Sequence, residues 1–444
     1  MSRTKVTFIL FFPFLFFPYF CGENFANVSY LNYIFFLVFA FTLLKSTKDK
    51  TRLLLSPAYV TTLYLYICFL IGDFLFRSGI YIDYRHYDYY TSWNHQQLSN
   101  TYTNIATYLG LVSYYCCPKD GFLNLNNHFF NSAKKARLVG LVLLFVSLVS
   151  IRLLGESSIK DIIVSLACVF AILTLYSIKK STITNLRFLL YFSVIAFFAI
   201  ADPDDKRNSI FLFYVIALLE VPNLKRLKIK HVFYVSLASL FLFFAIVIMS
   251  IFRSASSASE NISIKDALYL IPEYVTADAS LAVIANNFEI DFVYINSFQA
   301  VEFIEDNPSH MMYGSSYLKP LFLPIPRSVY PNKPLSAMLE YTIVYDQEAA
   351  DEGYCLPLSL AAEAYWNFRY GAVLIVFLYF YFLNWFYCKG INTLYKLKEK
   401  DYSNILFLFA MYLMIMLIRG AGLDIFTLQF LIGVFVIYIF RKIV

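Results

Sequence analysis

Residues 54–76 have the sequence LLSPAYVTTLYLYICFLIGDFLF, a nearly continuous apolar run of 23 residues. Crossing the hydrocarbon core of a bilayer, about 30 Å thick, takes roughly 20 residues of helix. Backbone amide and carbonyl groups have no water to bond inside lipid, so a segment that crosses must satisfy them itself, as a helix does. The run therefore predicts a membrane-spanning helix.

Runs of the same kind recur along the chain. It is 59% hydrophobic and 20% aromatic, with a mean hydropathy of +0.61, well above the roughly 45–50% apolar share of soluble domains. The expected fold class is all-α, a polytopic integral membrane protein with about 12 transmembrane helices. The predicted spans are 6–20, 28–44, 54–76, 101–117, 138–154, 161–178, 186–201, 209–222, 231–252, 370–388, 403–418 and 422–440.

The first run also has features of a secretory signal peptide, because Arg3 and Lys5 precede it. Its flank, Cys21-Gly-Glu-Asn24, offers no small-residue cleavage site. This flank favours a retained span over a removed leader.

One long polar segment interrupts the spans. Residues 253–369 make 117 residues between two strongly apolar runs, and they hold 15 carboxylates against 6 basic residues, a net charge of −9. The segment has helical stretches such as Leu281–Glu289, and it should pack on the mouth of the bundle. The expected division is spans one to nine in 1–252, one large loop in 253–369, and spans ten to twelve in 370–444.

The basic residues orient the spans. If the N-terminus is cytoplasmic, 23 of the 36 basic residues fall in inner segments and 13 in outer ones. Cytoplasmic loops carry the excess of lysine and arginine. Both termini are therefore expected in the cytoplasm, and the large loop on the outer face. In a bacterium this is a multi-pass inner (cytoplasmic) membrane protein with a periplasmic loop.

Arginine is concentrated on the outer side. It makes up 8 of the 13 outer basic residues but only 6 of the 23 inner ones. Membrane orientation would accept either basic residue, whereas a guanidinium matches phosphate oxygens in a two-pronged geometry that lysine cannot offer. Four outer arginines also lie where a span meets the outer face, where charges tend to be functional: Arg207, Arg253, Arg369 and Arg419. The alternative is that single arginines extend to the interface to keep their charge in water.

Within the acidic loop, the basic residues differ in their surroundings. For Lys265 and Lys319 we expect salt bridges. Arg327 and Lys333 instead lie in Pro324-Ile-Pro-Arg-Ser-Val-Tyr-Pro-Asn-Lys-Pro334. Proline fixes φ and restricts the residue before it, so this stretch can hold a cation in place. A rigid surface turn is the alternative.

Other patterns carry less chemistry. Asp202-Pro-Asp-Asp-Lys-Arg207 is a tight outer turn whose three carboxylates could supply a base or a metal ligand, or be a solvated turn; Asp205 is the candidate base. The seven cysteines show no C-x-x-C spacing, so neither a metal site nor a disulfide framework is expected. The chain contains no glycine-rich phosphate loop, H-E-x-x-H or G-x-S-x-G motif, which removes support for nucleotide hydrolysis, metalloproteolysis and serine hydrolysis. No cofactor and no nucleic acid partner is expected.

A series of motifs has the order found in one family. Its members in this chain are Arg207, Arg253, Gly314-Ser-Ser-Tyr317, Pro326-Arg-Ser-Val-Tyr-Pro-Asn-Lys-Pro334, Glu363-Ala-Tyr-Trp-Asn-Phe-Arg-Tyr-Gly371 and Arg419-Gly420. This series resembles the bacterial O-antigen polymerases, also called oligosaccharide repeat-unit polymerases. The likeness is strongest over 311–371 and at 419–420, and elsewhere it rests on span count and loop position.

The resemblance implies a glycosyl transfer at the periplasmic face. Repeat units carried on undecaprenyl pyrophosphate would be joined, with the lipid pyrophosphate as leaving group. Cations placed where negative charge develops lower such a barrier. We therefore expect Arg207, Arg253, Arg327 and Arg419 to converge on the pyrophosphate, with Lys333 supporting them. Arg327 and Arg419 are the catalytic cations of this set.

The acceptor hydroxyl needs a base, for which Glu363 is the first candidate and Asp205 the second. The bland alternative for Glu363 is that it pairs with Arg369 or caps the following helix. The implied partners are the lipid-linked oligosaccharide and membrane lipid, with a chain-length regulator protein as an optional third.

Two other functions stay open. Twelve spans with both ends inside also describe transporters, including flippases for the same lipid-linked units. Transporters tend to show two related halves, and no internal repeat is found here. The second alternative is the O-antigen ligase, which has a similarly placed loop. The segment His310-Met-Met-Tyr-Gly314 resembles a motif of these ligases.

Overall fold

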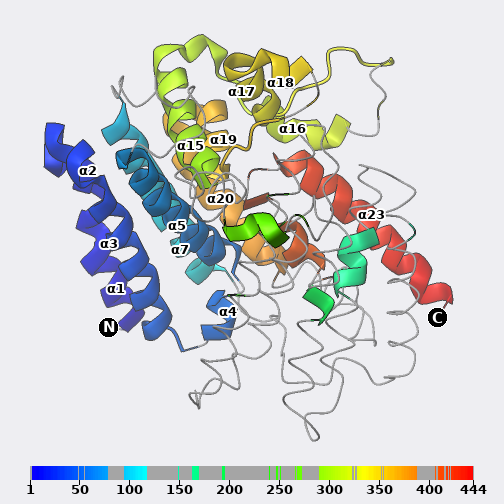
Figure 1. Ribbon diagram of the computed structural model, residues 1–444, viewed down its shortest axis with the longest axis horizontal. Helices are drawn as coiled ribbons and strands as arrows, with labels where there is room; N and C mark the ends of the chain where they lie inside the picture. The colour runs from blue at the N-terminus through cyan, green and yellow to red at the C-terminus, as the bar shows by residue number, and fades with distance from the viewer. Residues whose placement is uncertain are drawn as a thin grey trace, which may run out of the picture. The chain divides into compact units, whose positions relative to one another are not determined.

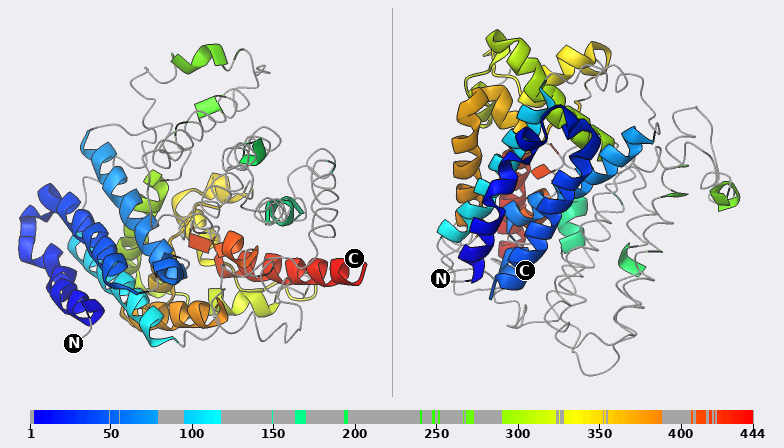
Figure 2. Two further views of the ribbon diagram at one scale, coloured as in Figure 1. Left: turned by 90° about the horizontal axis from the view of Figure 1, so that it is seen from below. Right: turned by 90° about the vertical axis from the view of Figure 1, so that its left-hand side faces the viewer.

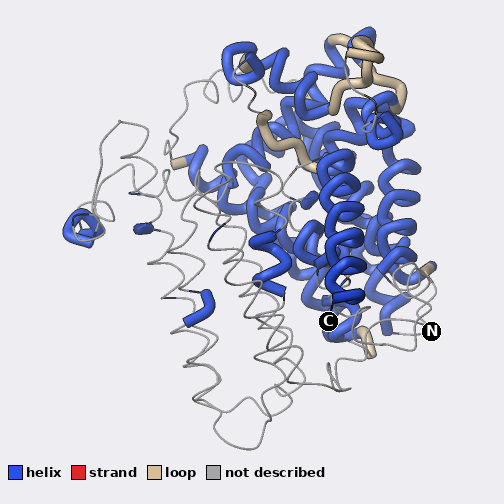
Figure 3. The backbone as a smooth tube through the Cα atoms, turned by 90° about the vertical axis from the view of Figure 1, so that its right-hand side faces the viewer, coloured by secondary structure: helices blue, strands red, loops and turns tan. Residues whose placement is uncertain are grey.

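The computed structural model describes residues 3–48, 50–54, 56–78, 95–117, 290–322, 328–351, 355–387 and 422–443, together with short isolated pieces between them. Over these residues the regular structure is entirely helical (Figure 1). Figure 3 shows the same residues as helices joined by loops, with no strand among them. The expected all-α class is confirmed for this part of the chain.

Five of the predicted spans coincide with observed helices. They are α3 (Phe25–Ser46), α5 (Pro57–Arg77), α7 (Gln96–Cys116), α20 (Ala372–Trp385) and α23 (Gly422–Ile443). Three helical stretches are long and apolar enough to cross a membrane: Arg3–Ser46, Pro57–Arg77 and Leu360–Trp385. The spans predicted at 138–154, 161–178, 186–201, 209–222 and 231–252 lie wholly or largely outside the described residues, and 403–418 is described only in pieces, which are helical. The count of twelve therefore stays a prediction.

The first apolar run is a broken helix. It consists of α1 (Arg3–Phe11), the 3-10 turn η1 (Phe12–Phe16) and α2 (Phe17–Cys21). Pro13 and Pro18 lie at the breaks, because proline lacks the N–H that would continue the helical ladder. Gly22, with φ +54°, then reverses the chain, and α1 and α2 lie back along α3 (Figure 2).

Hydrogen bonds between helix ends show which way the helices run. At one end of the bundle, the side chain of Gln97, near the start of α7, donates to the carbonyl of Gly22 at 2.6 Å. At the same end, Arg77 at the end of α5 donates to the carbonyl of Ala26 near the start of α3. The end of α2 and of α5 therefore lies beside the starts of α3 and α7.

At the opposite end of the bundle, the ends of α3 and α7 lie together, and the start of α5 lies beside the end of α20. The hydroxyls of Thr47, just after α3, and Tyr115, near the end of α7, are 2.6 Å apart. Ser56, just before α5, donates to Asn384 near the end of α20 at 3.1 Å. Consecutive long helices thus run antiparallel, and α20 begins at the end where α5 finishes.

The segment between the predicted spans nine and ten contributes a layer of shorter helices. These are α15 (Ile290–Asp306), α16 (Ser315–Phe322), α17 (Ala337–Tyr345), α18 (Gln347–Asp351) and α19 (Leu360–Phe368). The helix expected at Leu281–Glu289 lies outside the described residues, and α15 starts at the next residue.

Helix α15 packs along α5 and α19. The ring of Tyr294 covers Gly72, where an added Cβ would come within 2.7 Å of it. The Tyr294 hydroxyl also donates to the buried carboxylate of Asp73 at 3.1 Å. This part of the expected loop is therefore packed against the bundle, beside the end of α5.

The chain divides into two compact units. One comprises Met1–Asp120, Leu281–Cys388 and Met416–Leu428, and the other comprises Gly121–Ser280, Lys389–Ile415 and Gln429–Val444. The boundaries expected at 252/253 and 369/370 stay predictions. The residues described below around Glu363 belong to the first unit, whereas Arg207, Arg253 and Asp205 of the expected site belong to the second.

Candidate functional site

Helix α19 places Glu363 inside the protein. The helix begins at Leu360 because the hydroxyl of Ser359 caps it, accepting the amide of Ala362 at 3.3 Å. Glu363 lies one residue further along, and its side chain is only 6% exposed. Ser359, and not Glu363, is therefore the cap of this helix.

The pairing of Glu363 with Arg369, which the sequence left open, is wrong. The guanidinium of Arg369 pairs with both carboxylate oxygens of Glu305, at 2.7 Å each. The hydroxyls of Tyr365 and Tyr370 donate to the same carboxylate. These bonds, led by that of Arg369, lower the pKa of Glu305 to about 2. Arg369 therefore links the end of α19 to α15 and stabilises their packing.

Arg77, the other outer arginine in the described ranges, has a similar role. Its Nε lies 2.7 Å from the buried carboxylate of Asp73. Its guanidinium also donates to the hydroxyl of Ser29 in α3, so the arginine joins α5 to α3. For these two arginines, the outer location reflects packing between helices.

Asn367 joins Glu363 to a distant segment. Its side-chain carbonyl accepts the backbone amide of Gly314 at 3.1 Å, and its amide group donates to the Ser316 hydroxyl at 2.9 Å. The Ser316 hydroxyl in turn donates to Glu363 Oε1 at 3.4 Å. One asparagine therefore orients both a hydroxyl and the loop that carries it toward the carboxylate.

The approach of the two segments is close. Gly314 has φ +86°, and an added Cβ would come within 2.7 Å of the ring of Phe368. A side chain at this position would be both strained in its backbone and blocked by the ring. The glycine is what allows Ser316 to reach Glu363.

A partly buried ion pair lies beside this network. Lys319 Nζ is 2.6 Å from Asp424 Oδ2, with side-chain exposures of 16% and 8%. Both charges act electrostatically on Glu363. The salt bridge expected for Lys319 is confirmed, whereas Lys265 lies outside the described residues. Asp424 was not expected at the site, although an acidic residue in the first turn of a predicted span is itself a signal of function.

The segment around Gly420 packs against the chain before α19 through its backbone. Gly420 has φ +102°, and an added Cβ would lie 2.5 Å from the backbone nitrogen of Leu358. Gly420 therefore packs directly against the residues that lead into α19. Its neighbour Arg419 lies outside the described residues.

Two phenols border the site. The ring of Tyr317 stacks on Phe368 at 5.9 Å and meets Tyr379 of α20 edge-on at 6.3 Å. The hydroxyls of Tyr317 and Tyr379 are buried and have no hydrogen-bond partner among the described residues. Burial, and after it the charge of Glu363, raises the pKa of Tyr317 well above its ordinary value, so this phenol keeps its proton and can donate it in a hydrogen bond.

Most of the expected phosphate clamp falls outside the described residues: Arg207, Arg253, Arg327 and Arg419, and with them the second candidate base Asp205. Their convergence stays a prediction. Lys333 is described, and its ammonium donates to the carbonyl of Ile325 at 2.9 Å. That bond links the two ends of the proline-rich stretch.

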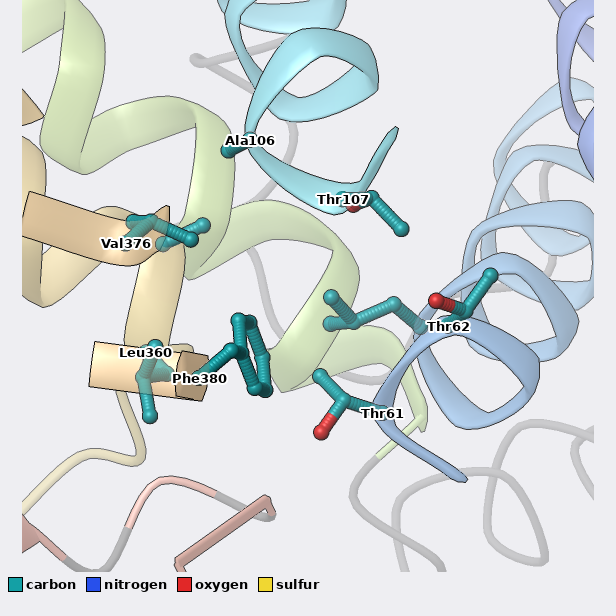
Figure 4. Close-up of a pocket in the computed structure, with 9 residues that line it drawn as sticks. Thr61, Thr62, Ala106, Thr107, Leu360, Val376 and Phe380 are labelled. Carbon is teal, nitrogen blue, oxygen red and sulfur yellow. The ribbon is translucent and has the colours of Figure 1, made fainter. Parts of the chain in front are cut away.

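A small cavity lies behind the start of α19 (Figure 4). Thr61 and Thr62 of α5, Thr107 of α7 and Phe380 of α20 line it together with Leu360. None of its lining side chains in the described part of the chain is charged. It is a packing space between helices and not part of the charged site. Among the described residues, no group of three histidine, cysteine or acidic side chains could hold a metal ion.

The arrangement supplies three chemical functions within one buried region. Glu363 offers a carboxylate oxygen, Ser316 and Tyr317 offer hydroxyl groups, and Lys319 offers a positive charge shared with Asp424. A buried carboxylate oriented by fixed donors can accept a proton from a hydroxyl brought to it. Ser316, Lys319, Asn367 and Asp424 were not among the expected site residues.

No protein-family model matches the chain, and no curated protein or solved structure matches it either.

Proposed function

We propose that the protein is an O-antigen polymerase. It joins oligosaccharide repeat units carried on undecaprenyl pyrophosphate at the periplasmic face of the bacterial inner membrane. The growing chain leaves its lipid carrier and passes to a sugar hydroxyl of a fresh lipid-linked unit.

The observation that carries the proposal is the meeting of three distant segments around Glu363. Residues 314–319, 363–367 and the start of α23 at Asp424 form one polar cluster through hydrogen bonds and an ion pair. The first two segments, and Arg419-Gly420 just before the third, are the motifs that resemble the polymerases. Packing, buried polarity and motif order thus agree.

In the proposed reaction, Glu363 acts on the acceptor hydroxyl and the basic residues act on the leaving pyrophosphate. The acceptor hydroxyl oxygen forms a bond to the anomeric carbon of the donor as the bond from that carbon to the pyrophosphate oxygen breaks. Glu363 takes the proton of the acceptor hydroxyl. The departing pyrophosphate carries the negative charge, which Arg207, Arg253, Arg327 and Arg419 stabilise, with Lys333 supporting them.

The alternation of helix direction supports this placement. The layer that contains Glu363 lies at the end where α5 finishes and α7 and α20 begin. In the expected orientation this is the outer end of every one of these spans. A lipid-linked unit that has crossed the membrane would present its pyrophosphate at that level.

Deleting the gene and running the lipopolysaccharide on a gel tests the function. Loss of a polymerase leaves flipping and ligation intact, so the core should carry one repeat and no ladder. A bare core would point to a flippase, or, with polymer retained on the lipid carrier, to a ligase. An unchanged ladder would refute all three.

Complementing the deletion with variants tests the role of Glu363. Glu363→Gln keeps most of the hydrogen bonding but cannot accept a proton, so we expect no ladder. Glu348→Gln is the matched control, because Glu348 is an exposed glutamate of the same loop region. A full ladder from Glu363→Gln would remove Glu363 from the chemistry and leave Asp205 as the candidate base.

A further inference from the structure

Helix α16 has two opposite faces. Ser316 and Lys319 lie on the side that is turned toward Glu363 and Asp424. Leu318 and Leu321 lie on another side and are 51% and 72% exposed. Positions three residues apart share a face of a helix, so the eight residues of α16 separate a polar, buried side from an apolar, exposed one.

The exposed apolar surface continues into the following turn. The rings of Phe322 and Tyr330 are 5.6 Å apart, which fixes the turn against the end of α16. Val329 in this turn is 72% exposed. Apolar residues gathered on one exposed surface normally mark a contact with a partner or with lipid.

The neighbours of α16 are apolar helices, and one of them, α20, belongs to a stretch long and apolar enough to cross a membrane. Tyr317 contacts Tyr379, which lies seven residues into α20, about 10 Å along the helix at about 1.5 Å per residue. Lys319 pairs with Asp424 in the first turn of α23. Helix α16 therefore lies beside the first two turns of α20 and the first turn of α23.

Helix α20 carries its own exposed apolar side chains, Leu374 and Phe382 among them. In a helix that crosses a membrane, these side chains face lipid. Helix α16 packs against this helix through the rings of Tyr317 and Tyr379. Exposed apolar side chains on a helix packed against a lipid-facing helix are expected to have the same neighbour.

We propose that the apolar surface formed by Leu318 and Leu321 of α16 and by Val329 of the following turn lies in the outer leaflet of the bilayer, with α16 as an interfacial helix. Such a helix places its apolar side about 5–10 Å into the boundary between headgroups and acyl chains. Its polar side then forms the membrane-level wall of the Glu363 site. A substrate whose reactive group rests at the headgroups would reach Glu363 past α16, whatever the reaction performed there.

Tryptophan fluorescence of the full chain in lipid nanodiscs tests this. Leu321→Trp and Leu318→Trp each place a reporter on the proposed face, and subtracting the emission of the unmodified protein removes the native tryptophans. We expect blue-shifted emission that is lost in lipids brominated near the upper part of the acyl chain and is little affected by aqueous iodide. Glu348→Trp, at an exposed position of α18, is the matched control and should respond to iodide and not to brominated lipid.

Two results would overturn the proposal. Quenching of Leu321→Trp by iodide and not by brominated lipid would place α16 in water. Protection of both tryptophans from both quenchers would mean that protein, such as a second copy of the chain, covers the face. The readout does not require activity, so loss of the polymerase proposal would leave it standing.

Discussion

Replacing Asn367 with alanine is the sharpest test of how the site is built. Asn367 is fully buried, and its side chain makes three hydrogen bonds: with the amide of Gly314, the hydroxyl of Ser316 and the carbonyl of Glu363. Each such bond contributes about 1 kcal/mol net, and a buried group left without its partner costs about 1–3 kcal/mol. Asn367→Ala should therefore lower the free energy of unfolding by about 3 kcal/mol or more.

The same change should also reduce activity, because Ser316 would lose the donor that orients it toward Glu363. Asn307→Ala is the matched control. Asn307 is exposed and makes one side-chain hydrogen bond, to the carbonyl of Phe303 at 3.1 Å. Surface substitutions of this kind usually change stability by no more than about 0.5 kcal/mol.

Unfolding of the purified protein by SDS titration in mixed micelles measures the stability difference, and the lipopolysaccharide ladder of complemented cells measures the activity. We expect Asn367→Ala to be less stable and to make no ladder, and Asn307→Ala to keep the stability and the ladder of the unmodified protein. Equal stability of the two variants would refute the hydrogen-bond network. A stable, fully active Asn367→Ala would show that Ser316 needs no orientation.

Three further outcomes are expected. The pKa of Glu305 is lowered to about 2 from its ordinary value of 4.5. The stability that this carboxylate contributes is therefore present above about pH 4.5 and is lost as the pH falls toward 2. Between pH 6 and pH 3, the thermal unfolding temperature of Glu305→Gln should fall less than that of the unmodified protein. Gly420→Ala should yield little folded protein in size-exclusion chromatography because its Cβ would meet the backbone of Leu358 at 2.5 Å, whereas Gly353→Ala, also at positive φ but with nothing within 4 Å, should cost only about 1–2 kcal/mol. Arg327→Lys should shorten or abolish the ladder nearly as severely as Arg327→Ala, since lysine lacks the two-pronged geometry, and a normal ladder from the lysine variant would contradict the clamp.

The helices themselves could be predicted from the sequence. Apolar runs at 28–44, 54–76, 370–388 and 422–440 coincide with α3, α5, α20 and α23, because length and hydropathy are properties of a single segment. The first run was predicted less well. Its length indicated one span, but the prolines within it divide the helix into α1, η1 and α2.

Individual site residues could be predicted where local chemistry identified them. Glu363 is a carboxylate next to a predicted span, in a motif with a recognisable order, and Lys319 is a cation in an acidic segment, which indicated an ion pair. The sequence could not tell which carboxylate pairs with Lys319. Asp424 is 105 positions away, and only the packing of α16 against the start of α23 brings the two side chains to 2.6 Å.

The tertiary structure alone decided which arginine belongs to the framework. Arg369 lies at a span end, as a phosphate ligand would, and its partner Glu305 lies on α15. Their pairing depends on α15 crossing α19, a contact between segments that local sequence patterns do not encode. The same holds for Ser316 and Asn367, whose polar side chains are ordinary in the sequence. They become part of a site only because the fold buries them beside Glu363, where they hydrogen-bond to one another and Ser316 donates to the carboxylate.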